Sequence, residues 1–282
     1  MEFKANPKLD AALAALEGDM IETLQRWVRV PSVRAERSAD NAPFGDAVRK
    51  SLDVAMEDIA RLGMNPRDID GYCCDAEIGE GEESLAVLAH LDVVPEGDWS
   101  MWKYPPFEAH VDEDGILWGR GCTDSKNNIQ GYMDALELLI ADGFVPDYDL
   151  YFAFGYNEEI MGGPGAAGQI LQDELKARGI EFGMAIDECG GVAEVDGKLV
   201  ATIIPCEKGY ADYEFYVEEP GGPSAFPPVH TALGKLGYAI WTLENNRMEP
   251  MLIEPVIREM KARAPFMTGE LAELFKDPEA NW

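Results

Sequence analysis

Histidine and cysteine are both scarce in this sequence. The chain has three histidines in 282 residues, His90, His110 and His230, which are too few and too scattered for a histidine-rich metal cage. Its five cysteines are an odd number without a CxxC pair, which argues against a disulfide framework and against a cysteine-rich zinc site. Any metal site in this protein therefore has to use carboxylates, and the thiols predict a reducing, cytoplasmic location.

The sequence also lacks a long hydrophobic run, and it has few basic residues relative to acidic ones. No apolar stretch approaches the ~20 residues that span a bilayer, and the first residues, 1–4, do not have the layout of a signal peptide. The 23 basic residues are outnumbered by 53 acidic ones, which gives a formal net charge of −30. Such a surface repels phosphate and anionic lipid, so we expect neither a nucleic-acid nor a membrane partner. Most carboxylates are interpreted as a solvated acidic surface.

Apolar runs and helical periodicity alternate along the first two thirds of the chain. The runs at 84–89, 149–154 and 182–186 are typical of strands that are buried on both faces, as in a parallel sheet. Helical spacing of apolar residues predicts helices at 9–29, 45–62, 127–142 and 164–178. This alternation predicts an α/β fold with a mainly parallel, helix-covered sheet.

The pattern changes near residue 208. Residues 210–217 alternate as a half-exposed antiparallel strand would, and a Pro/Gly-rich turn at 219–223 precedes an amphipathic helix at 228–244. A length of 282 residues also fits about two domains. We therefore predict an α/β domain over residues 1–208 and a smaller α+β region over 209–282.

Polar, metal-binding residue types follow each of the three apolar runs. The runs end in His90-Leu91-Asp92, Asn157-Glu158-Glu159 and Asp187-Glu188, and a fourth candidate, Asp124, follows the turn Gly119-Arg120-Gly121. Because ligands bind at the carboxyl ends of strands in open α/β sheets, these groups are expected to meet at one edge. Taken singly, each motif is more often an ordinary polar strand end or a solvated acidic pair than a metal site.

Together these residues form a chemically complete arrangement. His90 can bind a metal through one ring nitrogen while Asp92, on the same face of the strand, accepts a hydrogen bond from the other. Asp124 can bridge two cations, and in the Glu158-Glu159 pair one carboxylate can bind metal while the other acts as general base. Mixed imidazole and carboxylate ligands suit Zn²⁺ and tolerate Co²⁺ or Mn²⁺.

The order and context of these motifs resemble one family. The stretch from His90-Leu91-Asp92-Val93-Val94-Pro95 to Asp124-Ser125-Lys126, followed by the acidic motifs at 157–159 and 187–188, is similar to two-zinc metallopeptidases and amidohydrolases. Members of this family include carboxypeptidase S, aminoacylase, acetylornithine deacetylase, succinyl-diaminopimelate desuccinylase and Xaa-His dipeptidase. Residues 90–95 and 227–231 favour the carboxypeptidase S-like branch.

The resemblance implies a zinc exopeptidase-like catalytic domain over 1–208 and part of a lid or dimerisation domain over 209–282. It implies two Zn²⁺ ions, with one held by His90 and Asp187 and the other by Glu159, while Asp124 bridges them. Glu158 is then the general base and Asp92 orients His90. The implied enzyme is a zinc-dependent dipeptidase, carboxypeptidase or N-acyl amino acid amidohydrolase. Its substrate is a short peptide or N-acyl amino acid, and the lid implies a homodimer.

Two departures from the family pattern bear on activity. The family takes a further histidine ligand from near the end of a longer chain, whereas this sequence ends at Trp282, so we expect an incomplete form with little turnover. The lid's usual Gly-Gly-His-Ser is replaced by Gly221-Gly222-Pro223-Ser224, and proline has no proton to donate. The alternative is a catalytically inactive relative that acts as a binding or interaction protein. The intact candidate residues favour the hydrolase.

Overall fold

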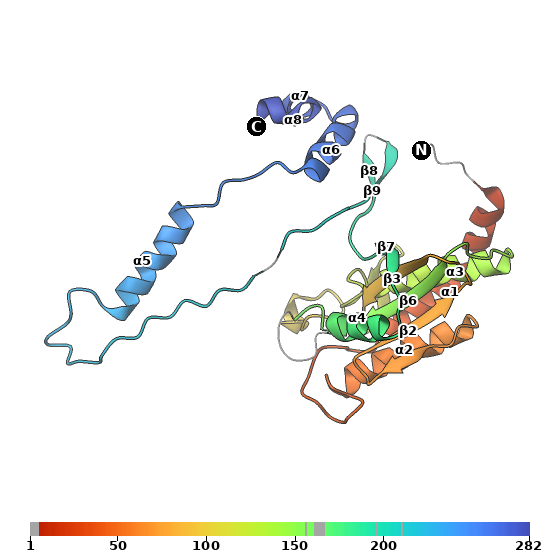
Figure 1. The fold of residues 1–282 in the computed structure, drawn as a ribbon, viewed down its shortest axis with the longest axis horizontal. Helices are drawn as coiled ribbons and strands as arrows, with labels where there is room; N and C mark the ends of the chain where they lie inside the picture. Colours follow the sequence, from red (N-terminus) through yellow and green to blue (C-terminus); the bar gives the residue numbers. More distant parts are fainter. Residues whose placement is uncertain (1–5, 156, 161–166, 196, 210) are drawn as a thin grey trace. The chain divides into compact units, whose positions relative to one another are not determined.

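The computed structural model describes residues 6–155, 157–160, 167–195, 197–209 and 211–282. The chain divides into two compact units, Met1–Glu188 and Cys189–Trp282 (Figure 1). This division precedes the domain boundary that the sequence predicts near residue 208. Within the described residues, no helix combines the length and the apolar character needed to cross a membrane.

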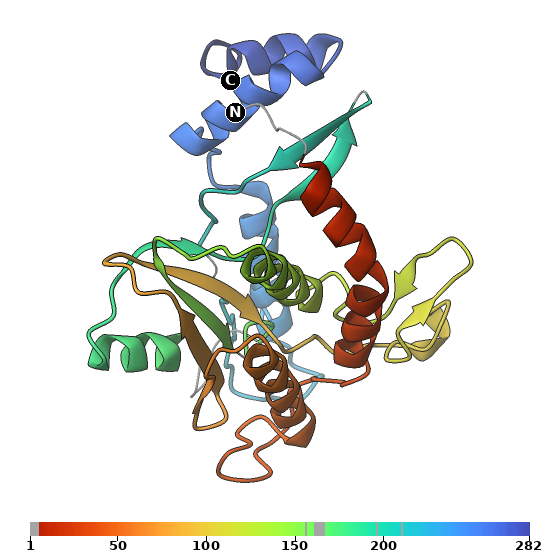
Figure 2. The same ribbon diagram turned by 90° about the vertical axis from the view of Figure 1, so that its right-hand side faces the viewer.

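A five-stranded mixed sheet forms the centre of the N-terminal unit (Figures 1 and 2). In spatial order its strands are β1 (Arg67–Ile69), β2 (Cys73–Ile78), β6 (Asp149–Gly155), β3 (Ser84–His90) and β7 (Phe182–Ile186). The last three are parallel to one another, and β2 is antiparallel to both β1 and β6. The three predicted strands and their parallel arrangement are therefore confirmed, whereas the antiparallel β1 and β2 were not predicted.

The described part of this unit contains four α-helices, namely α1 (Pro7–Val28), α2 (Asp46–Arg61), α3 (Lys126–Ala141) and α4 (Ala167–Ala177). Each coincides with a predicted helix, although residues 164–166 of the fourth lie outside the described residues. Helices α2 and α4 contact β2, and α3 contacts β3. The start of α1 is fixed locally, because the side chain of Asn6 accepts hydrogen bonds from the Lys8 and Leu9 amides.

Large apolar side chains fill the space between these helices and the sheet. Trp27, Leu52, Ile59 and Phe154 are each at most 1% exposed. The carboxylate of Asp75, on β2, is also buried. It accepts two hydrogen bonds from Arg67, at 3.0 Å each, and one from Arg178 Nη1 at 2.7 Å. Two guanidinium groups thus compensate the cost of burying this charge.

The C-terminal unit contains a β-hairpin and short helices (Figure 1). Its elements are β8 (Gly191–Val195), β9 (Lys198–Thr202), α5 (Ala232–Asn245), α6 (Glu254–Arg263), the 3-10 helix η2 (Ala264–Phe266), α7 (Glu270–Lys276) and α8 (Pro278–Asn281). Helix α5 confirms the helix predicted at 228–244. The strand predicted at 210–217 is wrong over residues 211–217, which form no regular structure, because no described strand pairs with them.

Candidate metal centre

The candidate site lies at the carboxyl ends of the parallel strands, as the sequence predicts. His90 is the last residue of β3, and its side chain is buried. In the sheet His90 pairs with Gly155, the last residue of β6, and Val87 pairs with Ile186, the last residue of β7. The residues that follow these strands are therefore delivered to the same edge of the sheet.

Carboxylates from three chain segments surround one nitrogen of His90. His90 Nε2 lies 3.0 Å from Asp124 Oδ1, 3.2 Å from Glu188 Oε2 and 3.9 Å from Glu158 Oε2. Single ligand atoms of His90, Asp124 and Glu188 all fall within 4.8 Å of one another. One imidazole nitrogen with carboxylate oxygens is a donor set that suits zinc.

The two acidic residues after β7, Asp187 and Glu188, make different contacts. Glu188, partly buried, contacts His90, whereas the exposed Asp187 turns its Oδ1 to the Glu188 amide, which donates to it at 2.9 Å. The Asp187 carbonyl also accepts a hydrogen bond from the Tyr132 hydroxyl at 3.2 Å. The structure thus brings Glu188 into the cluster and does not bring in Asp187, the residue that the resemblance gave as ligand. The ligand role of Asp187 stays a prediction.

Asp92 links His90 to the glutamate pair. The backbone carbonyl of Asp92 lies 3.0 Å from His90 Nδ1, and its Oδ1 lies 3.5 Å from the same nitrogen. The Asp92 carboxylate also accepts hydrogen bonds from the amides of Glu158 and Glu159, at 3.4 and 3.3 Å. Asp92 is almost fully buried, so these contacts fix its carboxylate between the two segments. The geometry suits the predicted orienting role.

The two glutamates have different surroundings. Burial raises the pKa of Glu158, and the nearby carboxylate of Glu188 raises it further while His90 opposes both. Burial also raises the pKa of Glu159, with Asp124 as the next largest cause. Glu159 Oε1 accepts a hydrogen bond from the Val94 amide at 3.3 Å. Glu158 therefore faces His90, and Glu159 lies on the Asp124 side of the site.

The imidazole of His90 sits in a strongly negative field. Burial disfavours its charged form, but hydrogen bonds with Asp92 and Glu188 outweigh burial and raise the pKa of His90 to about 11. The same contact with His90 lowers the pKa of Glu188. A metal ion that binds Nε2 must replace the proton held there, so binding releases a proton.

Two residues that follow Asp124 support the site although the sequence assigned them no role. Ser125 Oγ donates to the His90 carbonyl at 3.3 Å. Lys126 is fully buried, and its ammonium donates to the carbonyls of Trp27 and Val30 at 3.0 and 2.8 Å, at the end of α1. A lysine two residues after the candidate bridging aspartate was the available signal, but its partners lie almost one hundred residues away.

The other two histidines lie outside the cluster. His110 belongs to the short hairpin of β4 (His110–Val111) and β5 (Leu117–Trp118), which follows the 3-10 helix η1 (Trp99–Met101). Its ring stacks on Tyr104 with centroids 3.8 Å apart. His230 is exposed and lies two residues before α5. Among the described residues, the group around His90 is the only one with metal-ligand spacing.

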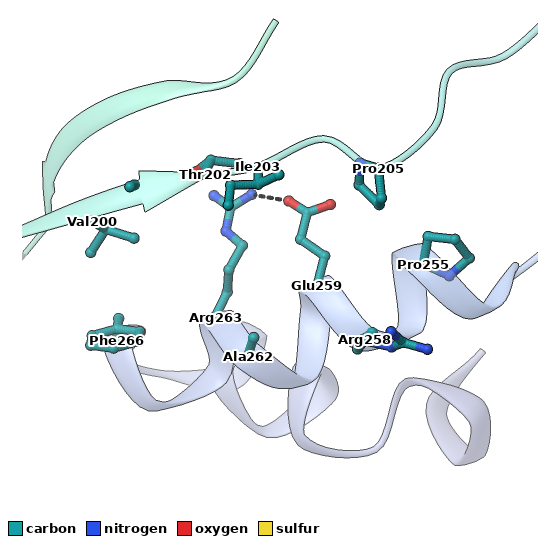
Figure 3. Close-up of a pocket in the computed structure, with 11 residues that line it drawn as sticks. Val200, Thr202, Ile203, Pro205, Pro255, Arg258, Glu259, Ala262, Arg263 and Phe266 are labelled. Atoms are coloured by element: carbon teal, nitrogen blue, oxygen red, sulfur yellow. Dashed lines mark hydrogen bonds and ion pairs between the residues drawn. The ribbon is translucent and has the colours of Figure 1, made fainter. Parts of the chain in front are cut away.

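A separate concave region lies in the C-terminal unit (Figure 3). Its volume is about 420 Å³, and β9 with the following residues forms one wall while α6 and η2 form the other. The apolar lining comprises Val200, Ala201, Ile203, Pro205, Pro255, Ala262 and Phe266. Arg263 Nη1 donates to Glu259 Oε1 at 3.0 Å, so these two charges are paired with each other. This cavity offers no cluster of metal-binding side chains among the residues described.

Comparison with known proteins agrees with this geometry. Residues 86–275 match the family model of peptidase family M20/M25/M40. Carboxypeptidase S of Saccharomyces cerevisiae is 41% identical over 257 residues, which cover 82% of this chain and 42% of that protein. The N-fatty-acyl-amino acid synthase/hydrolase PM20D1 of Xenopus tropicalis is 30% identical over 264 residues, which cover 89% of this chain and 50% of that protein.

The fold has a solved counterpart. Human carnosine dipeptidase 1 superposes with a TM-score of 0.51 at 19% identity, over 64% of this chain and 40% of that chain. The α/β class is thereby confirmed. The chain spans about half the length of the curated relatives that it matches. The resemblance seen in the sequence is also confirmed: the chain belongs to peptidase family M20/M25/M40 and is carboxypeptidase S-like.

Proposed function

We propose that this protein is a metal-dependent hydrolase that cleaves the amide bond of a dipeptide, a short peptide or an N-acyl amino acid. The observation that carries the proposal is the convergence of Asp124 and Glu188 on His90 Nε2, with Glu158 Oε2 at 3.9 Å from the same nitrogen. Names of relatives support the substrate class, since one is a carboxypeptidase and another an N-fatty-acyl-amino acid synthase/hydrolase.

The side chains present fit a zinc ion. His90 offers Nε2 while Asp92 occupies the other ring nitrogen, and Asp124 and Glu188 supply oxygens within 4.8 Å. In this proposal His90, Asp124 and Glu188 hold one ion, and Asp124 with Glu159 contributes to a second. When bound, zinc would polarise the scissile carbonyl and make a water molecule more acidic. Residues 1–208 then carry the chemistry, and 209–282 form part of a lid.

Glu158 has the position and the electrostatics of a general base. Its carboxylate takes a proton from the attacking water as the new C–O bond forms, and gives that proton to the amine nitrogen as the C–N bond breaks. The raised pKa of Glu158, caused first by burial, favours holding the proton between these two steps. Asp92 helps to hold Glu158 in place by accepting a hydrogen bond from its backbone amide.

The test is a Glu158→Gln variant assayed on a panel of dipeptides and N-acyl amino acids, with bound zinc measured in parallel. Activity is expected to fall about a hundredfold to ten-thousandfold, as for loss of a general base, while zinc content is unchanged. A matched control is Glu137→Gln, which changes a glutamate on α3 that has an ion pair with Arg61. Unchanged activity in Glu158→Gln would remove Glu158 as the base.

A second candidate function is that of a catalytically inactive binding protein. Pro223 favours it, because it stands where the resembling family has a proton-donating histidine. The same panel separates the two candidates. Full zinc loading without hydrolysis of any substrate would favour the binding protein, and zinc-dependent turnover that Glu158→Gln abolishes would favour the hydrolase.

A further inference from the structure

The segment Ser32–Arg34 runs beside the chain that carries the metal-site residues. Val33 forms a parallel bridge with Val93, and the Val93 amide donates to the Ser32 carbonyl at 3.2 Å. Ser32 Oγ, fully buried, donates to the Leu91 carbonyl at 2.6 Å. These contacts hold the segment against residues 91–93, immediately after His90.

Arg34, at the end of this segment, reaches the loop that carries the candidate base. Its Nη1 donates to Asn157 Oδ1 at 2.5 Å, and its guanidinium lies 5.3 Å from the ring centroid of Phe44. Arginine can only donate, so this contact fixes which way the Asn157 carboxamide faces. Asn157 is 7% exposed and has a φ of +68°, a left-handed conformation that asparagine tolerates better than most residues.

The environment of Asn157 makes the Arg34 contact important for the loop. Asn157 Nδ2 is buried and has no hydrogen-bond partner among the described residues, which is unfavourable. The loop's other ties to residues 92–94 are the amides of Glu158 and Glu159 on Asp92 and the Val94 amide on Glu159, all at 3.3–3.4 Å. The contact from Arg34, at 2.5 Å, is the shortest of these described hydrogen bonds, and it is charge-assisted.

We propose that Arg34 is a positioning residue that sets the Glu158-Glu159 backbone through Asn157. The inference rests on the proposed function of Glu158 as base, because Arg34 acts on that residue's placement and does not join the group around His90. Three segments, 32–34, 91–94 and 157–159, then behave as one interlocked unit. Removal of the guanidinium makes the loop 157–159 more mobile, while the positions of His90, Asp124 and Glu188 relative to one another are unchanged.

The experiment measures amide hydrogen exchange at Glu158 and Glu159 in the full chain, residue by residue, by NMR. Arg34→Met is expected to speed exchange at both amides about tenfold or more, since a hydrogen bond to a charged group is lost. Exchange within β3, and the affinity for the zinc ion held by His90, Asp124 and Glu188, should change less than twofold. Arg34→Lys, which keeps a charged donor, should restore part of the protection. The control is Arg37→Met, whose guanidinium contacts Tyr72 and Asp40 instead.

A second variant covers the case in which Arg34→Met does not fold. Asn157→Gly keeps the left-handed backbone conformation but removes the carboxamide, so it should give the same local acceleration. Unchanged exchange in either folded variant, or equal acceleration throughout β3, would overturn the proposal. Because exchange needs no substrate, this result is independent of whether the protein hydrolyses amides. Where turnover is measurable, kcat should fall in Arg34→Met while KM stays constant.

Discussion

The two units of this chain differ in how they bury apolar side chains. In the N-terminal unit Leu52, Ile59 and Leu91 are fully buried, and all residues of the candidate metal group belong to this unit. In the C-terminal unit the described buried residues are small, such as Ala264 and Ala272. Large apolar side chains there are exposed, including Tyr213, Phe226, Leu233 and Met248. A site that must hold several ligands in place is found where packing fixes them.

The same contrast exists on a smaller scale between two neighbouring strands. Strand β3 lies between β6 and β7 and is mostly buried, whereas β7 is an edge strand of the described sheet, with Met184 55% and Ile186 41% exposed. His90 is thus the last residue of a well-packed strand, whereas Glu188 lies two residues beyond a loosely packed one. The imidazole is the most buried of the three groups in the cluster, since the side chain of His90 is 5% exposed and those of Glu188 and Asp124 are 21% and 66% exposed.

The largest expected effect is on stability, and it separates the two units. Leu52→Ala removes a fully buried side chain of α2, so the free energy of unfolding should fall by about 2–5 kcal/mol. Leu233→Ala changes a side chain of α5 that is 79% exposed and should alter it by less than about 0.5 kcal/mol. Urea unfolding followed by circular dichroism measures both. Equal losses would show that the C-terminal unit carries as much stabilising packing as the N-terminal one.

The central strands could be predicted from sequence because they are apolar along almost their whole length. Strand β2 escaped prediction because Asp75 interrupts its pattern, and that charge is tolerated only through Arg67 and Arg178, the second of which is 103 residues away. The opposite error occurred at 211–217, where alternation alone predicted a strand. Alternation of apolar and polar residues fits a strand with one buried face, but a segment with this pattern becomes a strand only when another strand pairs with it.

The candidate site was predictable to the level of chain segments. Polar residues after parallel strands must meet at one edge, so the convergence of His90, Asp124 and Glu158 followed from the motifs. The choice between Asp187 and Glu188 did not, because β7 ends at Ile186 and strand alternation no longer fixes where the next side chains face. Arg34 also escaped prediction, since its partner Asn157 is 123 residues away.

A second, smaller effect tests which of the two acidic residues after β7, Asp187 or Glu188, binds the metal. Glu188→Gln removes a charged oxygen next to His90 Nε2, and zinc affinity should fall on the order of a hundredfold. Asp187→Asn keeps an oxygen for the Glu188 amide and should leave zinc affinity nearly unchanged. Competition with a chromophoric chelator gives both dissociation constants. The reverse order of losses would restore Asp187 as the ligand.

The third effect builds up gradually with pH, and it concerns a buried charge in the N-terminal unit. Burial lowers the pKa of Lys126 from its ordinary 10.5 to about 7, although Asp92 opposes the shift. Between these two pH values the unfolded chain binds a proton that the folded chain lacks, so this lysine makes stability rise with pH.

Lys126→Met lacks this contribution. As the pH rises from 7 to 10, the free energy of unfolding of the wild type should therefore increase relative to that of the variant, by at most about 1.4 kcal/mol per pH unit. Lys235→Met is the matched control, because Lys235 is an exposed lysine of α5 paired with Glu219 in the other unit. Parallel pH–stability curves for the wild type and Lys126→Met would contradict the prediction. They would mean that the Lys126 ammonium keeps its proton against the carbonyls of Trp27 and Val30 throughout this range.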